Sequence, residues 1–99
     1  MEDKRTTSEE IREIFNELSD LVVSKNTDYG DSVFESPVMC PGMSGGMAIR
    51  VRLSDKIKRA IQLESHPAQV SNESLADAYR DMIGYCALRL IQLKELQDA

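Results

Sequence analysis

The chain of 99 residues is 41% hydrophobic and 29% charged, a composition typical of a globular domain in water. This length is enough for one domain with a small core, and small helical cores are often completed by a partner subunit. The formal net charge of −5 argues against duplex nucleic acid or an anionic membrane as the main ligand, because affinity for either rests on an excess of lysine and arginine.

The cysteine pattern and the first residues indicate a reduced, cytoplasmic protein. Cys40 and Cys86 do not have the spacing of a metal site, and the start MEDKRTTSEE lacks the apolar stretch of a signal peptide. The most apolar run, MIGYCALRLI, is interrupted by Arg89 and is too short to span a bilayer. We therefore expect a cytoplasmic location, in the host cytoplasm if a phage encodes the protein, and no membrane partner.

The first predicted helix covers about residues 8–25, and residues 1–7 are expected to be a flexible N-terminus. Thr7 or Ser8 can cap this helix, and Glu9 in its first turn interacts favourably with the helix dipole. One side carries an apolar stripe at helical spacing, made of Ile11, Ile14, Phe15, Leu18, Leu21 and Val22. The opposite side is acidic and carries Glu10, Glu13, Glu17 and Asp20.

A long loop rich in glycine, proline and methionine is predicted for residues 26–46, followed by a second helix over about residues 47–64. The predicted inner face of this helix is Ile49, Leu53, Ile57, Ala60 and Ile61. Beside it runs a polar stripe with members about one helical turn apart, namely Arg52, Asp55, Lys56 and Arg59. The helix should end before Pro67, because the residue before a proline leaves the helical region.

The third helix is the clearest of the three and should run from a cap at Ser71 or Asn72 to about Gln97. Its predicted core stripe is Leu75, Tyr79, Met82, Cys86 and Leu90. Further apolar residues make the helix apolar on nearly all sides, which indicates burial on more than one side. The sequence therefore predicts an all-α, three-helix bundle, formed by one domain over residues 1–99 and completed by homo-oligomerisation.

A row of carboxylates on the third helix is the first candidate for chemistry. Glu73, Asp77 and Asp81 are spaced by four and therefore lie on one face of a helix. Carboxylates one turn apart repel each other unless a cation lies between them. The cation can be Mg²⁺, bound through oxygen ligands, or a basic side chain from the stripe on the second helix. A metal-and-phosphate site and a structural salt-bridge network are both open interpretations.

The stretch KNTDYGDS, from Lys25 to Ser32, is the second candidate. Gly30 explains why a helix stops there, because it tolerates turn conformations. It does not explain the residues around it. We interpret Lys25, Asp28 and Tyr29 as one wall of a ligand pocket, whose other walls are the basic stripe and the acidic row.

Three blocks of this chain, KNTDYGDS, RVRLSDKIKRA and ESLADAYRDMIGYCAL, together resemble the small phage and bacterial family called nucleotide modification associated domain 1. The family pattern has a K-N-x-D-Y-G turn, an R-x-x-D-K-I-x-R helix and an E-S-L-x-D-x-x-x-D-x-x-x-Y-A helix. The family is similar to MazG-type nucleoside triphosphate pyrophosphohydrolases, so the resemblance implies a compact all-helical fold and a phosphorylated nucleoside as ligand. The matching positions are Lys25, Asn26, Asp28, Tyr29, Gly30, Arg52, Asp55, Lys56, Arg59, Glu73, Asp77, Asp81 and Tyr85.

Three functions are consistent with these residues. In a Mg²⁺-dependent nucleotide hydrolase, Glu73, Asp77 and Asp81 would hold the metal, the two aspartates would be catalytic, and the basic residues would bind phosphate. In a binding module without chemistry, an oligomer would sequester or sense a linear or cyclic nucleotide, for example as a phage anti-defence protein that sequesters a defence signal. In a structural interaction module, the charged rows would form salt bridges between subunits.

Overall fold

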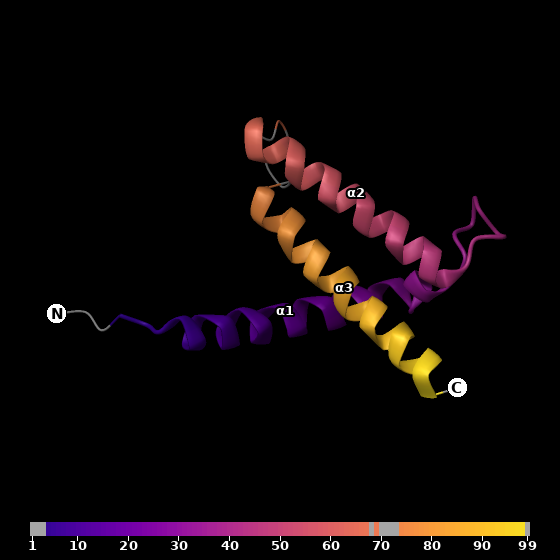
Figure 1. The fold of residues 1–99 in the computed structure, drawn as a ribbon, viewed down its shortest axis with the longest axis horizontal. Coiled ribbons are helices and arrows are strands. Elements are labelled where there is room, and N and C mark those ends of the chain that lie inside the picture. Colours follow the sequence, from indigo (N-terminus) through magenta and orange to yellow (C-terminus); the bar gives the residue numbers. More distant parts are fainter. Residues whose placement is uncertain (1–3, 68, 70–73, 99) are drawn as a thin grey trace. The chain divides into compact units, whose positions relative to one another are not determined.

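A computed structural model describes residues 4–67, 69 and 74–98. They form three α-helices and one short 3₁₀ helix, with no strand in this part of the chain (Figure 1). The elements are α1 Thr7–Tyr29, η1 Ser32–Phe34, α2 Gly45–Ser65 and α3 Leu75–Asp98. The predicted all-α fold is therefore confirmed. The chain divides into two compact units, Met1–Gly30 and Asp31–Ala99.

In the first unit, α1 begins earlier and ends later than predicted. Thr6 is the N-cap, and its hydroxyl oxygen accepts a hydrogen bond from the Glu9 backbone N–H at 3.1 Å. At the other end, Gly30 has the left-handed conformation (φ 59°, ψ 42°), and its N–H donates to the carbonyl oxygens of Asn26 and Thr27. The turn that ends the helix thus begins at Gly30. Residues 26–29, predicted as loop, form the last helical turn.

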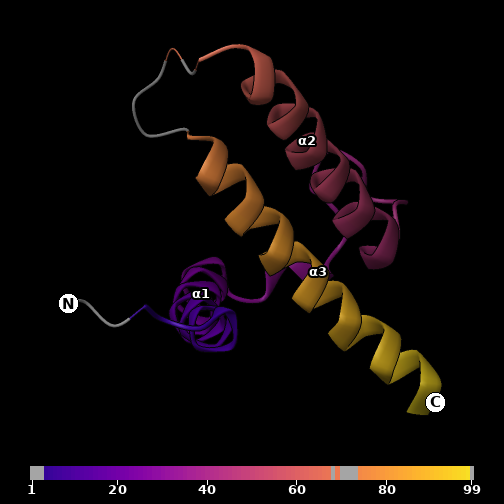
Figure 2. The same cartoon turned by 60° about the vertical axis from the view of Figure 1, so that its left-hand side comes forward.

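The second unit is an antiparallel hairpin of α2 and α3, with η1 packed on α2. Figures 1 and 2 show the two helices side by side with opposite directions. Lys56 in the middle of α2 pairs with Asp81, and the Tyr79 hydroxyl near the start of α3 donates to Glu64 near the end of α2. The buried hydrophobic residues of this unit are Val33, Ala48, Ile49, Ala60 and Ala78. Most of them are small, so the helices share an interface that contains little apolar volume.

The predicted core faces are only partly correct. On α2, Ile49 and Ala60 are buried as expected, whereas Ile57 and Ile61 are exposed. On α3, the predicted core stripe is largely wrong, because Tyr79, Cys86 and Leu90 are exposed. Periodicity could not decide the packed side of a helix that is apolar nearly all round. The side of α3 that contacts α2 carries residues such as Asp81.

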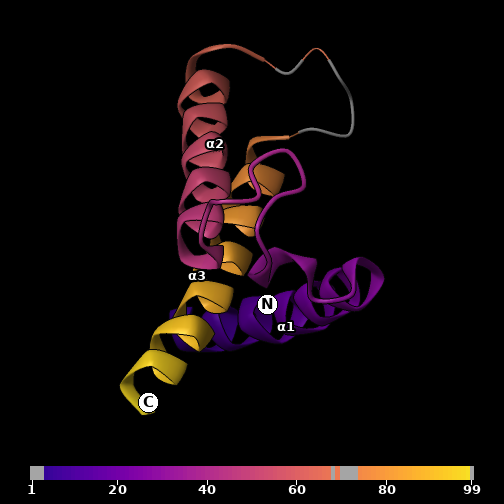
Figure 3. The ribbon, with the colours of Figure 1, turned by 90° about the vertical axis from the view of Figure 1, so that its right-hand side faces the viewer.

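The connection between η1 and α2, which Figure 3 shows as a loop, contains hydrogen bonds of its own. The Ser36 hydroxyl donates to the Met43 carbonyl oxygen at 2.6 Å, and the Cys40 N–H donates to the Pro37 carbonyl oxygen at 2.9 Å. Ser44 then caps α2 by accepting from the Met47 N–H at 3.1 Å. This loop is shorter than predicted, since α2 begins at Gly45. None of the described helices is long and apolar enough to cross a membrane.

Gly45 allows η1 to approach the first turn of α2. A Cβ at this position would overlap the backbone carbonyl oxygen of Phe34, which cannot move aside as a flexible side chain could. We expect Gly45→Ala to lower the free energy of unfolding by roughly 1–3 kcal/mol, the usual cost of overpacking, although alanine is normally the better helix former. Chemical denaturation measures this change.

Gly42→Ala is the matched control, because nothing lies within 4 Å of a Cβ there and the backbone is not left-handed. Its effect should stay within about 0.5 kcal/mol. If Gly45→Ala were as stable as Gly42→Ala, the close approach of η1 to α2 would be contradicted.

Candidate functional site

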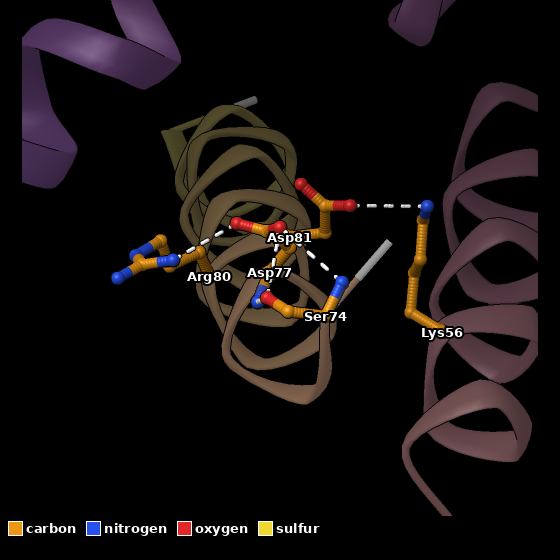
Figure 4. A network of polar contacts seen from close by, with 5 residues as sticks. All are labelled: Lys56, Ser74, Asp77, Arg80 and Asp81. Carbon is orange, nitrogen blue, oxygen red and sulfur yellow. Dashed lines mark hydrogen bonds and ion pairs between the residues drawn. The ribbon is translucent and has the colours of Figure 1, made fainter. Parts of the chain in front are cut away.

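An ion pair between the two long helices lies at the centre of the candidate site. The Lys56 ammonium on α2 lies 3.0 Å from the Asp81 carboxylate on α3 (Figure 4). Their side chains are 30% and 24% exposed, so both charges are partly removed from water. The pair joins the basic stripe of α2 to the acidic row of α3, which is the juxtaposition that the salt-bridge interpretation expects.

Arg52 and Arg59 extend the cationic face of α2 on either side of Lys56. All three side chains are half-buried, whereas Asp55 of the same stripe is exposed. Their spacing of four and three residues places them on one side of the helix, one turn apart. We refer to Arg52, Lys56 and Arg59 as the cationic face. Such a face interacts more strongly with an anion than fully hydrated lysines or arginines would, because the local dielectric constant is lower.

Asp77 has a local structural role at the start of α3. The Ser74 hydroxyl oxygen accepts from the Asp77 N–H at 3.1 Å, and the Asp77 carboxylate accepts from the Ser74 hydroxyl at 2.9 Å and from the Ser74 N–H at 3.4 Å. This reciprocal arrangement is a capping box. The other carboxylate oxygen of Asp77 is 2.9 Å from the Arg80 guanidinium. The predicted cap at Ser71 or Asn72 lies outside the described residues.

The electrostatics of Asp77 follow from these contacts. Hydrogen bonds from the side chain and the backbone of Ser74, together with the Arg80 guanidinium, lower the pKa of the Asp77 carboxyl. Its charged form is therefore favoured in the folded protein.

The acidic row is thus divided between two structural roles. Asp77 caps α3, Asp81 pairs with Lys56, and the predicted metal ligand Glu73 lies outside the described residues. Across the described ranges, no group of three or more histidine, cysteine, aspartate or glutamate side chains is arranged to hold a metal ion. Asp81 is the carboxylate beside the cationic face, so a Mg²⁺ ion there would take most of its ligands from a phosphate and from water.

A further cation, which the sequence analysis did not single out, lies at the N-terminus of α2. A Cβ at Gly46 would lie 2.7 Å from Nη1 of Arg89, so the guanidinium rests against the first turn of α2. Arg89 also donates to the Gln92 side chain at 3.0 Å. The first turn of α2 contains no acidic residue. Two features of the sequence could have indicated this contact. One is the Gly-Gly pair directly after the serine that caps α2, and the other is the arginine inside an apolar run.

Two tyrosines of α3 have different environments. Tyr85, a predicted ligand contact, is half-buried. Tyr79 is 46% exposed, and its hydroxyl donates to Glu64 at 2.9 Å. This hydrogen bond and the negative charge of Glu64 raise the pKa of the Tyr79 hydroxyl.

The candidate ligand-binding residues of the first unit lie at the end of a helix. This corrects the prediction that most of them belong to a loop. Lys25, Asn26, Asp28 and Tyr29 belong to the last turns of α1, and Gly30 follows as its left-handed cap. The Tyr29 side chain is 67% exposed and Asn26 is half-buried. The pocket that was predicted to combine this segment with the charged rows stays a prediction.

One protein family, nucleotide modification associated domain 1, matches residues 25–93. The match covers more than half of the chain and includes the three sequence blocks described above, so the chain belongs to this family. No curated protein and no solved structure matches the chain at a significant level. The similarity to MazG-type enzymes stays a prediction.

We predict that Asp77→Asn weakens the folded state mainly above about pH 4, the pKa range of an unfolded aspartate. Because the pKa of Asp77 is lowered on folding, its stabilising effect is present above the unfolded pKa and is lost as the pH falls through the folded pKa. The melting temperature of Asp77→Asn should be several degrees below that of the wild type at pH 7, and the difference should shrink towards pH 3. Thermal unfolding across this pH range measures both.

Ser74→Ala should show the same dependence on pH, because it removes the hydrogen bonds that the Ser74 side chain makes to Asp77. Ser54→Ala is the control, since the Ser54 hydroxyl donates only within α2, to the Arg50 carbonyl oxygen at 2.8 Å. An Asp77→Asn protein whose difference from the wild type did not vary with pH would argue against the capping box.

Proposed function

We propose that this member of the nucleotide modification associated domain 1 family binds a phosphorylated nucleoside, with the phosphate on the cationic face of α2. The observation that carries the proposal is the spacing of Arg52, Lys56 and Arg59, one turn apart and half-buried, together with the contact of Lys56 with Asp81 of α3. The family match over residues 25–93 supports a nucleotide context. A cytoplasmic location, where nucleotides are abundant, is part of the proposal.

A phosphate that binds Lys56 must replace the Asp81 carboxylate as its partner, and the ion pair between Lys56 and Asp81 is suited to this exchange. In the absence of ligand the carboxylate neutralises the ammonium, so the cation is not left buried without a counter-charge. A phosphate with two negative charges would compete with one carboxylate for Lys56. Because the pair is about a quarter exposed, separating it costs far less than separating a fully buried pair. The two arginines would add bidentate hydrogen bonds to phosphate oxygens.

The base and the sugar require other contacts. Tyr85 on α3 is half-buried and offers an aromatic face for stacking. Within the first unit, the exposed Tyr29 with its neighbours Lys25, Asn26, Asp28 and Gly30 is a separate proposed ligand-binding segment, supported by the start of the family match at residue 25. Substitutions in this segment test it independently of the cationic face.

Binding without turnover is the form of the proposal that the geometry supports best. Asp77, the residue on which a hydrolytic site would depend, uses its carboxylate to cap α3 and to pair with Arg80. Sequestration or sensing of a linear or cyclic nucleotide, as by a phage anti-defence protein that sequesters a defence signal, needs no metal. Mg²⁺-dependent hydrolysis is the second candidate. It rests on Asp81, whose carboxylate lies beside the cationic face and could bind a metal that arrives with the phosphate.

We predict that Lys56→Ala weakens nucleotide binding by about 10- to 100-fold, the effect of losing one charge-assisted hydrogen bond. The ligand is first identified by a thermal-shift screen of linear and cyclic nucleotides with and without Mg²⁺, and calorimetry then gives the dissociation constants. Lys58→Ala is the matched control, because it makes the same change in charge at an exposed position of α2. Equal affinities of the two variants would contradict the placement of the phosphate.

The fate of the bound nucleotide separates the two candidates. The protein is incubated with its ligand, denatured, and the released nucleotide is identified. Intact ligand, recovered with and without Mg²⁺, supports sequestration. A shortened nucleotide formed only with Mg²⁺, and lost in Asp81→Asn, supports hydrolysis. A screen in which no nucleotide stabilises the protein would overturn the proposed function and favour the structural interaction module.

A further inference from the structure

One side of α3 carries an exposed apolar stripe with the spacing of a coiled-coil seam. Its members follow one another at intervals of four, three, four and three residues: Tyr79, Ile83, Cys86, Leu90 and Leu93. All of them are exposed in the single chain, with Leu90 at 66%. The side of α3 that contacts α2 includes Ala78 and Asp81, and of the seam residues Tyr79 also contacts α2, through its hydrogen bond to Glu64. We call the five residues the α3 seam. Alternating intervals of three and four place such side chains along one line of a helix, where another helix can pack.

The charged residues that directly follow seam residues on α3 are positive. Arg80 and Lys94 directly follow the first and the last seam residue, and both are exposed. In a coiled coil, positions of this kind face the flank of the partner helix and set the choice of partner. The α3 seam therefore favours a helix whose own apolar stripe has an acidic flank.

The chain contains such a helix in its first unit. On α1, intervals of three, four and three residues give a second stripe, the α1 stripe, of Ile11, Ile14, Leu18 and Leu21. Leu18 is buried, while Ile11, Ile14 and Leu21 are 49%, 48% and 39% exposed. Glu10 and Glu17, which the sequence analysis assigned to the opposite side of the helix, border this narrower stripe, because they directly precede Ile11 and Leu18, and both are exposed. The flank of the α1 stripe is thus negative where the flank of the α3 seam is positive.

We propose that the α3 seam binds the α1 stripe of a second copy of this chain, and that the two copies exchange this contact reciprocally. Pairing two α3 seams would bring Arg80 and Lys94 against the same cations, and pairing two α1 stripes would bring glutamates against glutamates. Only the pairing of α1 with α3 combines the apolar surfaces with opposite charges. A two-fold dimer repeats this contact twice. A stable interface buries roughly 800 Å² per partner, which favours two such contacts over one.

Charge reversal tests the pairing. One variant carries Glu10→Lys and Glu17→Lys, and a second carries Arg80→Glu and Lys94→Glu. Sedimentation velocity should find the wild type as a dimer, and each variant should raise the dimer dissociation constant by at least about tenfold, because like charges then face each other. An equimolar mixture should form a heterodimer, since both of its contacts again join opposite charges. The variant with all four substitutions should recover the homodimer.

Other arrangements give different results. If α1 covered the α3 seam of its own chain, the four-substitution variant would recover stability as a monomer, and the mixture would not associate. If two α3 seams paired with each other, reversal on α1 would have no effect. A wild type that stayed monomeric at high micromolar concentration would also overturn the proposal. Far-ultraviolet circular dichroism confirms that each variant is folded, which matters for Arg80 because it pairs with Asp77.

A cross-linking measurement does not depend on changes in charge. Cys86 lies in the α3 seam and is exposed. With Cys40→Ser and Ile14→Cys, mild oxidation should join Cys86 of one copy to residue 14 of the other and give a covalent dimer. In the parent Cys40→Ser protein, a covalent dimer through two copies of Cys86 would instead indicate pairing of two α3 seams. A cross-linked monomer would indicate docking within one chain. None of these results depends on nucleotide binding, so the two proposals fail independently.

Discussion

The structure of residues 31–99 depends on how closely α2 and α3 approach each other. The approach is set by small residues, since Ala48, Ala60 and Ala78 are buried, and Gly45 leaves no space for a Cβ beside η1. Two helices share only one interface, and an interface filled by alanine buries little apolar area. Its polar members therefore remain partly hydrated, and the apolar residues on other sides of both helices remain exposed. The partly hydrated ion pair between Lys56 and Asp81 and the exposed α3 seam are both consequences of this small apolar interface.

Partial hydration gives the pair of Lys56 and Asp81 its chemical character. A fully buried pair would be too costly to separate, and a fully exposed one would hold neither partner in place. At 30% and 24% exposure, the two charges are held together and remain in contact with water, which is the property that the proposed exchange with a phosphate would use. Asp77 does not share this property, because its carboxylate completes the hydrogen bonds at the start of α3. Equal spacing along a helix therefore does not give two aspartates equal roles.

The sequence predicted the presence of three helices, the basic stripe and the acidic row, because these follow from spacing along a helix, and it proposed that the two rows meet because their charges are opposite. It did not predict where α1 ends. Asn26 to Tyr29 are poor helix formers, but the left-handed Gly30 determines the end, and the helix continues up to it. It also missed that Ser74 and Asp77 cap α3, since Asp77 fits both a capping box with Ser74, at a spacing of three, and a charged row with Asp81, at a spacing of four. The shape of α2 decides which face of α3 is packed, and the periodicity of the α3 sequence alone does not give this information.

The distribution of charge also limits the size of the ligand that the cationic face would accept. The chain carries 17 acidic and 12 basic residues, so a long polyanion meets net repulsion away from any basic patch. At physiological ionic strength a local positive potential extends only about 8 Å into the solvent. Arg52 and Arg59 are seven residues apart on α2, which corresponds to about 10 Å along a helix axis. A mononucleotide or a dinucleotide would fit inside this potential, whereas a nucleic acid chain would leave it and meet the acidic surface. The net charge that disfavours polyanions is thus compatible with a small phosphorylated ligand.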